Sequence, residues 1–170
     1  MHHILQRRSE RHFQRLVLLL VVLLLGAATP AFADATVFLG STMTPANRVA
    51  KGVAIGVGLV VIGFEFEFSD TGESDDEPAP SLRTGMGNVL LQTPFPIAGI
   101  QLYFTTGTGI YREQLEAQQE THIGFNTGGG AKISLLGPIR ARLDYRVFNL
   151  RGEPLHSTVH RIYAGLNLAF

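Results

Sequence analysis

The stretch RIYAGLNLAF, residues 161–170, alternates between two kinds of side chain without a break. Its even positions are all apolar: Ile162, Ala164, Leu166, Leu168 and Phe170. Successive side chains of a β-strand point to opposite faces, so this stretch predicts a strand with one apolar face. The terminal segments of most domains fray. An alternating pattern that continues to a final aromatic residue therefore favours a last strand that closes a membrane-embedded barrel.

The first 33 residues have the pattern of an export signal. A basic start, with arginines at positions 7, 8, 11 and 15, precedes 13 apolar residues at 16–28, and Ala31 and Ala33 give a small-residue cleavage pattern. A permanent membrane anchor is the alternative, but 13 residues are fewer than the roughly 18 that a spanning helix needs. We therefore predict a signal peptide over 1–33, cleaved after Ala33, and one domain over 34–170.

Removal of that segment changes the charge of the chain. The whole sequence has 14 basic and 14 acidic residues, and the segment 1–33 takes away four arginines and one glutamate. The remaining 10 basic and 13 acidic residues give a net charge of about −3. This offers no concentrated basic surface, so we predict no nucleic-acid partner. The chain has no cysteine, which excludes disulfides and thiolate metal sites.

The mature sequence divides into eight strand-like segments. They cover residues 36–43, 51–57, 60–69, 83–92, 99–112, 122–135, 139–150 and 157–170. The apolar positions change from odd numbers, such as Val57, to even numbers, such as Phe64, which predicts a turn or bulge near residues 58–61.

The connections between these segments alternate in length. TPANRVA, DTGESDDEPAPSL, a stretch around EQLEAQQET and RGEPLH are long, whereas the second, fourth and sixth connections are short. Outer-membrane barrels have long outer loops, short periplasmic turns and strands of about ten residues, which tilted near 40° rise roughly 25 Å. The sequence thus predicts an all-β fold, an eight-stranded antiparallel up-and-down transmembrane β-barrel.

Alternation alone leaves open which face points outward, since a soluble lipid-binding barrel would turn its apolar face inward. The other face is rich in glycine and has charges of both signs, which favours a narrow lumen and apolar side chains in lipid. We predict an interior charge network of Glu65, Glu67, Lys132, Arg140, Arg142, Asp144 and Arg146. These charges could instead line an ion path, but eight strands leave almost no bore, which favours structural ion pairs.

Two stretches resemble a known family. FNTGGGAKISLLGPIRARLDYRVF, residues 125–148, and the ending RIYAGLNLAF resemble the small eight-stranded outer-membrane barrels of Gram-negative bacteria, the OmpA- and OmpX-like group, and the outer membrane protein beta-barrel domain family. The resemblance implies a porin-like β-barrel protein of the cell outer membrane, exposed at the cell surface. It implies insertion by the barrel assembly machinery with the help of periplasmic chaperones. It also implies an assembly signal in Phe170, Leu168 and Leu166, contact with outer-membrane lipids and lipopolysaccharide, and a monomer.

The sequence offers little catalytic chemistry. A lipid A deacylase, which some barrels of this type resemble, needs a serine and a histidine within reach and an acid to orient the base. His156, Ser157 and His160 lie near the start of the last segment, with Glu153 close by, but His156 and Ser157 are adjacent and would face opposite sides of a strand. We predict no enzyme and no catalytic residues.

No cofactor or metal site is predicted either. The acidic residues Asp70, Glu73, Asp75, Asp76 and Glu77 could attract divalent cations, but they lack EF-hand spacing, which favours a solvated loop. The glycines 128–130 are not followed by the helix of a phosphate-binding loop. The predicted role is structural or adhesive, without an open pore. A lipid A-modifying enzyme and a soluble periplasmic lipid-binding barrel remain the alternatives.

Overall fold

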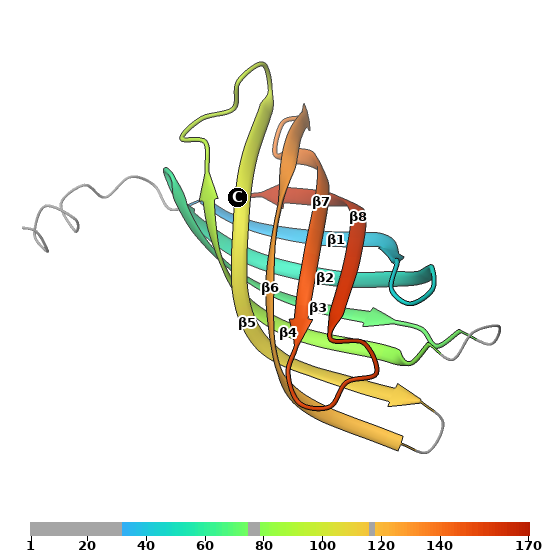
Figure 1. Ribbon diagram of the computed structural model, residues 1–170. Coiled ribbons are helices and arrows are strands. Elements are labelled where there is room, and N and C mark those ends of the chain that lie inside the picture. Colours follow the sequence, from blue (N-terminus) through green and yellow to red (C-terminus); the bar gives the residue numbers. More distant parts are fainter. Residues whose placement is uncertain (1–31, 75–78, 116–117) are drawn as a thin grey trace, which may run out of the picture. The chain divides into compact units, whose positions relative to one another are not determined.

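The computed structural model describes residues 32–74, 79–115 and 118–170, which form one closed barrel (Figure 1). Its strands are β1 (Phe32–Thr42), β2 (Arg48–Leu59), β3 (Ile62–Thr71), β4 (Ser81–Gln92), β5 (Ile100–Leu115), β6 (Gln118–Leu136), β7 (Ile139–Leu150) and β8 (Thr158–Ala169). Each strand pairs antiparallel with the next, and β8 pairs with β1. The predicted eight-stranded antiparallel barrel is confirmed. These described residues include no helix long and apolar enough to cross a membrane.

β1 begins before the predicted start of the mature domain. The backbone N–H of Ala33 donates to the carbonyl of Phe170 at 3.0 Å, and the N–H of Phe170 donates to the carbonyl of Ala33 at 2.9 Å. The boundary predicted after Ala33 therefore falls inside a paired strand. Residues 1–31 of the predicted signal peptide lie outside the described residues, so the signal peptide stays a prediction.

Three short connections lie at the same end of the barrel, which we call the turn end. Their tips are the pairs Val60–Val61, Ala98–Gly99 and Gly137–Pro138. The first residue of each pair has a positive φ, 38°, 51° and 54° respectively, as the hairpin turns that match strand twist require. The turn predicted near residues 58–61 is confirmed. Val60 gave no turn signal in the sequence because valine is rare at positive φ.

The opposite end, the loop end, has the connections 43–47, 72–80, 116–117 and 151–157. The long loop predicted around residues 113–121 is wrong, because β5 and β6 continue through it as a two-stranded ribbon. Glu113 pairs with Glu120, and Leu115 pairs with Gln118. The ribbon escaped prediction because its side chains are polar at successive positions, so the alternation that marks the other strands is missing.

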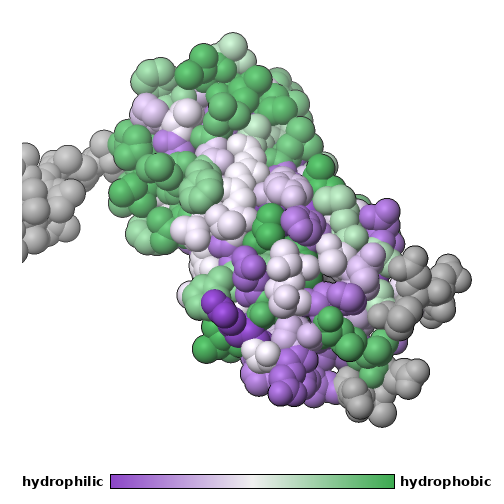
Figure 2. Space-filling model, in the orientation of Figure 1, coloured by the Kyte–Doolittle hydropathy of each residue, from purple (hydrophilic) through white to green (hydrophobic). Residues whose placement is uncertain are grey.

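The two faces of the sheet differ as predicted. The side chain of Phe66 on β3 points outward with 55% of its surface exposed, whereas Glu65 beside it is buried with 4% exposed. Leu166 is also exposed and Arg142 is buried. Hydrophobic residues gather toward the turn end of the barrel surface and hydrophilic residues toward the loop end (Figure 2). A soluble lipid-binding barrel would have the reverse arrangement, with aromatic side chains inside and charges outside.

Candidate functional site

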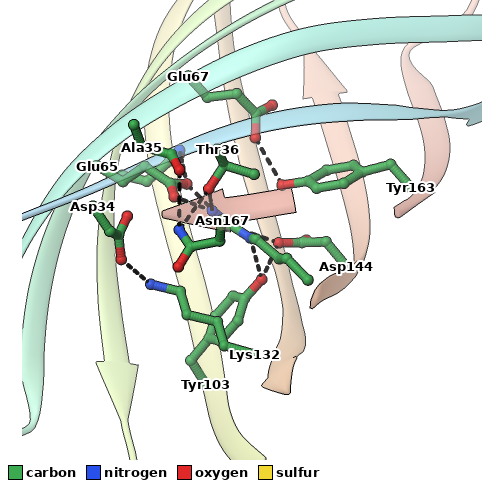
Figure 3. A network of polar contacts seen from close by, with 12 residues as sticks. Asp34, Ala35, Thr36, Glu65, Glu67, Tyr103, Lys132, Asp144, Tyr163 and Asn167 are labelled. Atoms are coloured by element: carbon green, nitrogen blue, oxygen red, sulfur yellow. Dashed lines mark hydrogen bonds and ion pairs between the residues drawn. The ribbon is translucent and has the colours of Figure 1, made fainter. Parts of the chain in front are cut away.

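Charged side chains fill the middle of the lumen and join β3 to β7. These two strands lie four positions apart in the closed eight-stranded sheet, so they face each other across the lumen. Strand alternation turns Glu65 and Glu67 of β3, and Arg142, Asp144 and Arg146 of β7, to the inside, where all five are buried. Figure 3 shows Glu65, Glu67 and Asp144 within this group of polar contacts. Together with Arg161 of β8, also buried, they form what we call the central network.

Glu65 and Asp144 are the best-bonded acids of the central network, because each accepts four hydrogen bonds. Both Nη atoms of Arg142 donate to its carboxylate, with Nη2 at 3.2 Å from Oε1, and Nη2 of Arg146 donates to Oε1 at 2.9 Å. Asp144 accepts from Nη2 of Arg142 at 2.9 Å and from Nε of Arg146 at 3.0 Å. The ion pairs of Arg142 and Arg146 with Glu65 connect opposite walls of the barrel, whereas the pair of Arg146 with Asp144 lies within β7.

The Glu67 end of the network is less well bonded. Nη1 of Arg146 lies 3.1 Å from Oε2 of Glu67, and Nη1 of Arg161 lies 3.6 Å from Oε1. These are ion pairs by distance, yet Oε1 of Glu67, Nη1 of Arg146 and Nη2 of Arg161 have no hydrogen-bond partner among the described residues. The hydroxyl of Tyr163 donates to Glu67 at 2.9 Å. Charge attraction therefore contributes more than hydrogen bonding here.

Arg161 was not in the predicted network, although the alternation of residues 161–170 placed it on the inward face. Its guanidinium donates to Ser69 at 2.6 Å and lies 4.4 Å from the ring centre of Phe148. The sequence signal was present in the parity of the last strand. Its partner Glu67 became evident only from the closed barrel.

Tyr163 and Tyr103 add hydrogen bonds to the network. The hydroxyl of Tyr103 accepts from Nε of Arg142 at 2.7 Å and donates to Asp144. Tyr103 needs space next to its ring, since a Cβ atom on Gly130 would lie 2.5 Å from the hydroxyl oxygen. The glycines of this face therefore make room for long side chains in a narrow lumen.

Lys132 and Arg140 do not pair with the acids that the sequence analysis offered them. Lys132 forms an ion pair with Asp34, and Nη2 of Arg140 lies 3.4 Å from the same carboxylate. Nε of Arg140 donates to Asn167 at 2.9 Å. This second group of charges lies toward the turn end. Asp34 was missed because the first strand was expected to begin at residue 36.

An apolar cluster lies in the lumen between the central network and the loop end. It consists of Leu82, Met86, Tyr111, Phe148, Leu150 and Val159, all buried. We call it the apolar plug. The sequence analysis did not predict it, although Phe148 and Leu150 continue the inward parity of Arg140 to Arg146 on β7. The charged face of this strand therefore becomes apolar near the loop end.

Buried polar residues tie the connections of the loop end to the barrel. Arg48 donates from Nη2 to the carbonyl of Thr44 at 2.8 Å and from Nη1 to the carbonyl of Pro80. The carboxylate of Glu113 accepts from the backbone N–H of Leu155 at 3.1 Å. Burial raises the pKa of Glu113 above its ordinary value. Three connections are thereby held against the barrel wall.

The candidate catalytic residues are not brought together. Nδ1 of His160 lies 2.7 Å from the hydroxyl of Tyr145, on the outward side of the wall. Ser157 lies in the connection before β8, and no hydrogen bond in the described part of the chain links it to His156, His160 or Glu153.

The acidic cluster is only partly described. Asp70 lies at the end of β3 and bonds Arg83, whereas Asp75, Asp76 and Glu77 lie outside the described residues. In the rest of the barrel, no three acidic or histidine side chains come close enough to hold a metal ion. Residues 128–130 lie within β6, in a strand rather than a phosphate-binding loop.

No known family model and no curated protein sequence matches the chain. Solved structures do match. Neisserial surface protein A has a TM-score of 0.62 and 14% identity, over 82% of this chain and 96% of that one. The N-terminal β-barrel domain of OprF from Pseudomonas aeruginosa has a TM-score of 0.61 and 13% identity, over 82% of this chain and 97% of that one. The chain has the fold of the small eight-stranded outer-membrane barrels.

This fold occurs with different roles. The outer membrane enzyme PagL also matches, with a TM-score of 0.51 and 8% identity, over 79% of this chain and 98% of that one. Such identities show the barrel and its topology and leave the role of this chain to its own residues.

Proposed function

We propose that the chain is an integral outer-membrane barrel with a structural or surface-interaction role and no open pore. The observation that carries this proposal is the inversion of the wall, with aromatic and aliphatic side chains outside and ion pairs inside. A charge on the lipid face near mid-membrane costs roughly 2–4 kcal/mol. From the turn end, the outward faces of β2, β3 and β8 are apolar, and the first polar outward residue on each is Lys51, Asp70 and His160, respectively.

The side chains inside the lumen support a barrel without an open pore. The central network spans it from β3 to β7, and the apolar plug lies between this network and the loop end. An ion that moved through the barrel would have to separate buried ion pairs and pass an apolar constriction. We therefore assign the interior charges to stability, and the loop end with the β5–β6 ribbon to contacts outside the cell.

A lipid A-modifying activity is the alternative from the sequence analysis, and the match to the outer membrane enzyme PagL shows that a barrel of this fold can be an enzyme. Catalysis needs a nucleophile and a base within hydrogen-bond reach. His160 bonds Tyr145 instead, and no hydrogen bond within the described residues joins Ser157 to a histidine. We propose that the chain is not an enzyme. Unchanged lipid A acylation after expression, in wild type and Ser157→Ala alike, is the expected result.

The export and assembly roles rest on the sequence and on the last strand. We propose cleavage after Ala33 and insertion through periplasmic chaperones and the barrel assembly machinery, with Phe170, Leu168 and Leu166 as the assembly signal. These three side chains are exposed on the outward face. Deletion of Phe170 should leave synthesis unchanged and reduce the inserted fraction, whereas normal insertion would contradict the assembly role.

Membrane fractionation with heat-modifiable gel mobility tests the main proposal. A folded barrel should need detergent for extraction and should change its mobility on boiling. Release by salt or osmotic shock would support the soluble periplasmic lipid-binding barrel instead. Recordings in planar bilayers should show no stable conductance for the wild-type monomer, and a regular open channel would contradict the closed lumen.

A further inference from the structure

The charged residues on the outward face of the strands fall into a single row. Of the outward positions in the eight strands as described, the charged ones are Lys51 on β2, Asp70 on β3, Arg83 on β4 and Arg112 on β5. They are direct neighbours in the sheet, because Lys51 pairs with Asp70, Asp70 with Arg83, and Arg83 with Arg112. We call these four residues the outer row.

The outer row stands at the boundary of the apolar surface. On β3, Ile62, Phe64, Phe66 and Phe68 point outward before Asp70, and on β2 the outward residues from Val53 to Leu59 are apolar before Lys51. Toward the turn end, outward positions on the described strands carry no charge. The row therefore lies where the apolar band ends and the loop end begins, the depth of a lipid headgroup in the outer leaflet.

The outer row has an excess of positive charge. Arg83 donates to Asp70 at 2.7 Å while 62% of its side chain stays exposed. Neither Lys51 nor Arg112 forms an ion pair with another described residue, and Nε of Arg112 donates only to the hydroxyl of Thr121, at 3.4 Å. Three cations thus face one carboxylate, whereas Lys132 and the three arginines of the central network all pair with acids.

An apolar hollow of about 780 Å³ opens on the outer wall next to the row. Val37, Val53, Phe68 and Leu166 line it, and Lys51 and Asp70 border it. The wall therefore offers an apolar surface beside a cation, which suits a lipid with an anionic headgroup. Lys51 and Arg112 stand three strand spacings apart, roughly 14 Å, so that a headgroup with more than one phosphate could contact both.

We propose that the outer row binds the phosphate groups of lipopolysaccharide, with an acyl chain in the apolar hollow. The proposal rests on the proposed membrane insertion and names the lipid that the wall selects. Arginine recognises phosphate through paired hydrogen bonds, and lysine acts as a point charge. Asp70 holds the Arg83 guanidinium at the surface and limits the net attraction.

The test compares lipids bound to the folded protein. The full chain is inserted into phosphatidylcholine vesicles that contain a small fraction of lipid A, dephosphorylated lipid A or phosphatidylglycerol, and the retained lipids are counted by native mass spectrometry. Wild type should enrich lipid A over both comparison lipids. Because each exposed cation near an anionic surface contributes roughly a fivefold factor, the variant Lys51→Gln/Arg83→Gln/Arg112→Gln should lose at least tenfold of that enrichment.

Two single variants serve as controls. Asp70→Asn removes the carboxylate of the row and should raise lipid A retention about twofold to threefold, since one opposing charge is lost. Arg151→Gln removes an exposed cation from the connection between β7 and β8, outside the row, and should leave retention unchanged. Equal losses from Arg151→Gln and the triple variant would show general charge attraction and overturn the site.

The outcomes separate this site from the proposed function. Heat-modifiable mobility and resistance to extraction report insertion for every variant. If wild type does not insert, the proposed function fails. If all variants insert and the triple variant retains lipid A like wild type, the outer row fails alone. A change in oligomeric state with unchanged lipid retention would assign the row to contacts between copies of the chain, and would also overturn the proposal.

Discussion

The charges inside the barrel and the charges on its outer wall follow opposite arrangements. In the central network, three arginines and three carboxylates are buried, and each lies within ion-pair distance of an opposite charge. In the outer row, Lys51 and Arg112 have no such partner in the described residues. A buried charge must be paired because burial removes its water. A charge at the edge of the apolar band keeps water and the polar headgroup region as its surroundings.

The comparison shows that position in the wall decides what an arginine contributes. Arg142 and Arg83 both lie in strands, and each contacts a carboxylate. The first connects two opposite walls and is buried, whereas the second lies exposed beside its partner on the neighbouring strand. The stability of the barrel should therefore depend on the first and hardly on the second.

Arg142→Met should have the largest effect on stability. It leaves Glu65 and Asp144 with one arginine in a buried site, and loss of one partner from a buried pair costs about 3–5 kcal/mol. Urea unfolding of the inserted barrel measures the free energy of unfolding. Arg83→Met is the matched control and should cost at most about 1 kcal/mol. Equal losses for the two variants would remove the distinction between lumen and outer wall.

Phe66→Arg tests the opposite error, a new charge on the lipid side. Phe66 lies in the middle of the outward face of β3, where an arginine should destabilise the barrel by roughly 2–4 kcal/mol. Val49→Arg is the control, because Val49 is 70% exposed and lies beyond Lys51 toward the loop end. That variant should cost about 0–1 kcal/mol. Tolerance of Phe66→Arg would mean that this face does not meet hydrocarbon.

The two glutamates of β3 should differ in how much they contribute to the free energy of unfolding. Glu65 accepts bonds from two arginines, whereas Glu67 accepts one from Tyr163 and leaves Oε1 without a hydrogen-bond partner among the described residues. Hydrogen bonds to charged groups contribute about 1.5–3 kcal/mol each. We expect Glu65→Gln to destabilise the barrel by about 1–2 kcal/mol more than Glu67→Gln in the same unfolding assay. The reverse order would show that bond geometry does not rank these ion pairs.

The sequence predicted the faces of the wall because alternation is a local property. Parity separated Phe64, Phe66 and Leu166 from Glu65 and Arg142, and the glycines and paired charges of the second face assigned that face to the inside, as observed. Parity does not say which inward residues meet across the lumen. That depends on closure and on strand register, which put Lys132 beside Asp34 rather than beside the acids of β3 and β7.

Other features were missed because their pattern was absent or interrupted. The β5–β6 ribbon is polar on both faces, so nothing in Glu113 to Thr121 distinguished a strand from a loop. Asp34 was expected to be the first residue after the cleavage site and was not included in a predicted strand. The apolar plug combines inward residues of four strands, among them Leu82 and Val159, whose proximity follows only from the closed sheet.

Asp70→Asn should have the smallest effect on stability and gives the finest test of the comparison. The Asp70–Arg83 pair has good geometry, with 2.7 Å between Nε and Oδ1, but its side chains are 30% and 62% exposed. An exposed pair of this kind contributes about 0–1 kcal/mol, and salt screens it. The difference between wild type and Asp70→Asn should therefore vanish in 1 M salt, whereas the loss caused by Arg142→Met should persist because salt does not reach the lumen. A salt-sensitive loss at Arg142 would show that ions enter the central network, and the closed barrel would then be wrong.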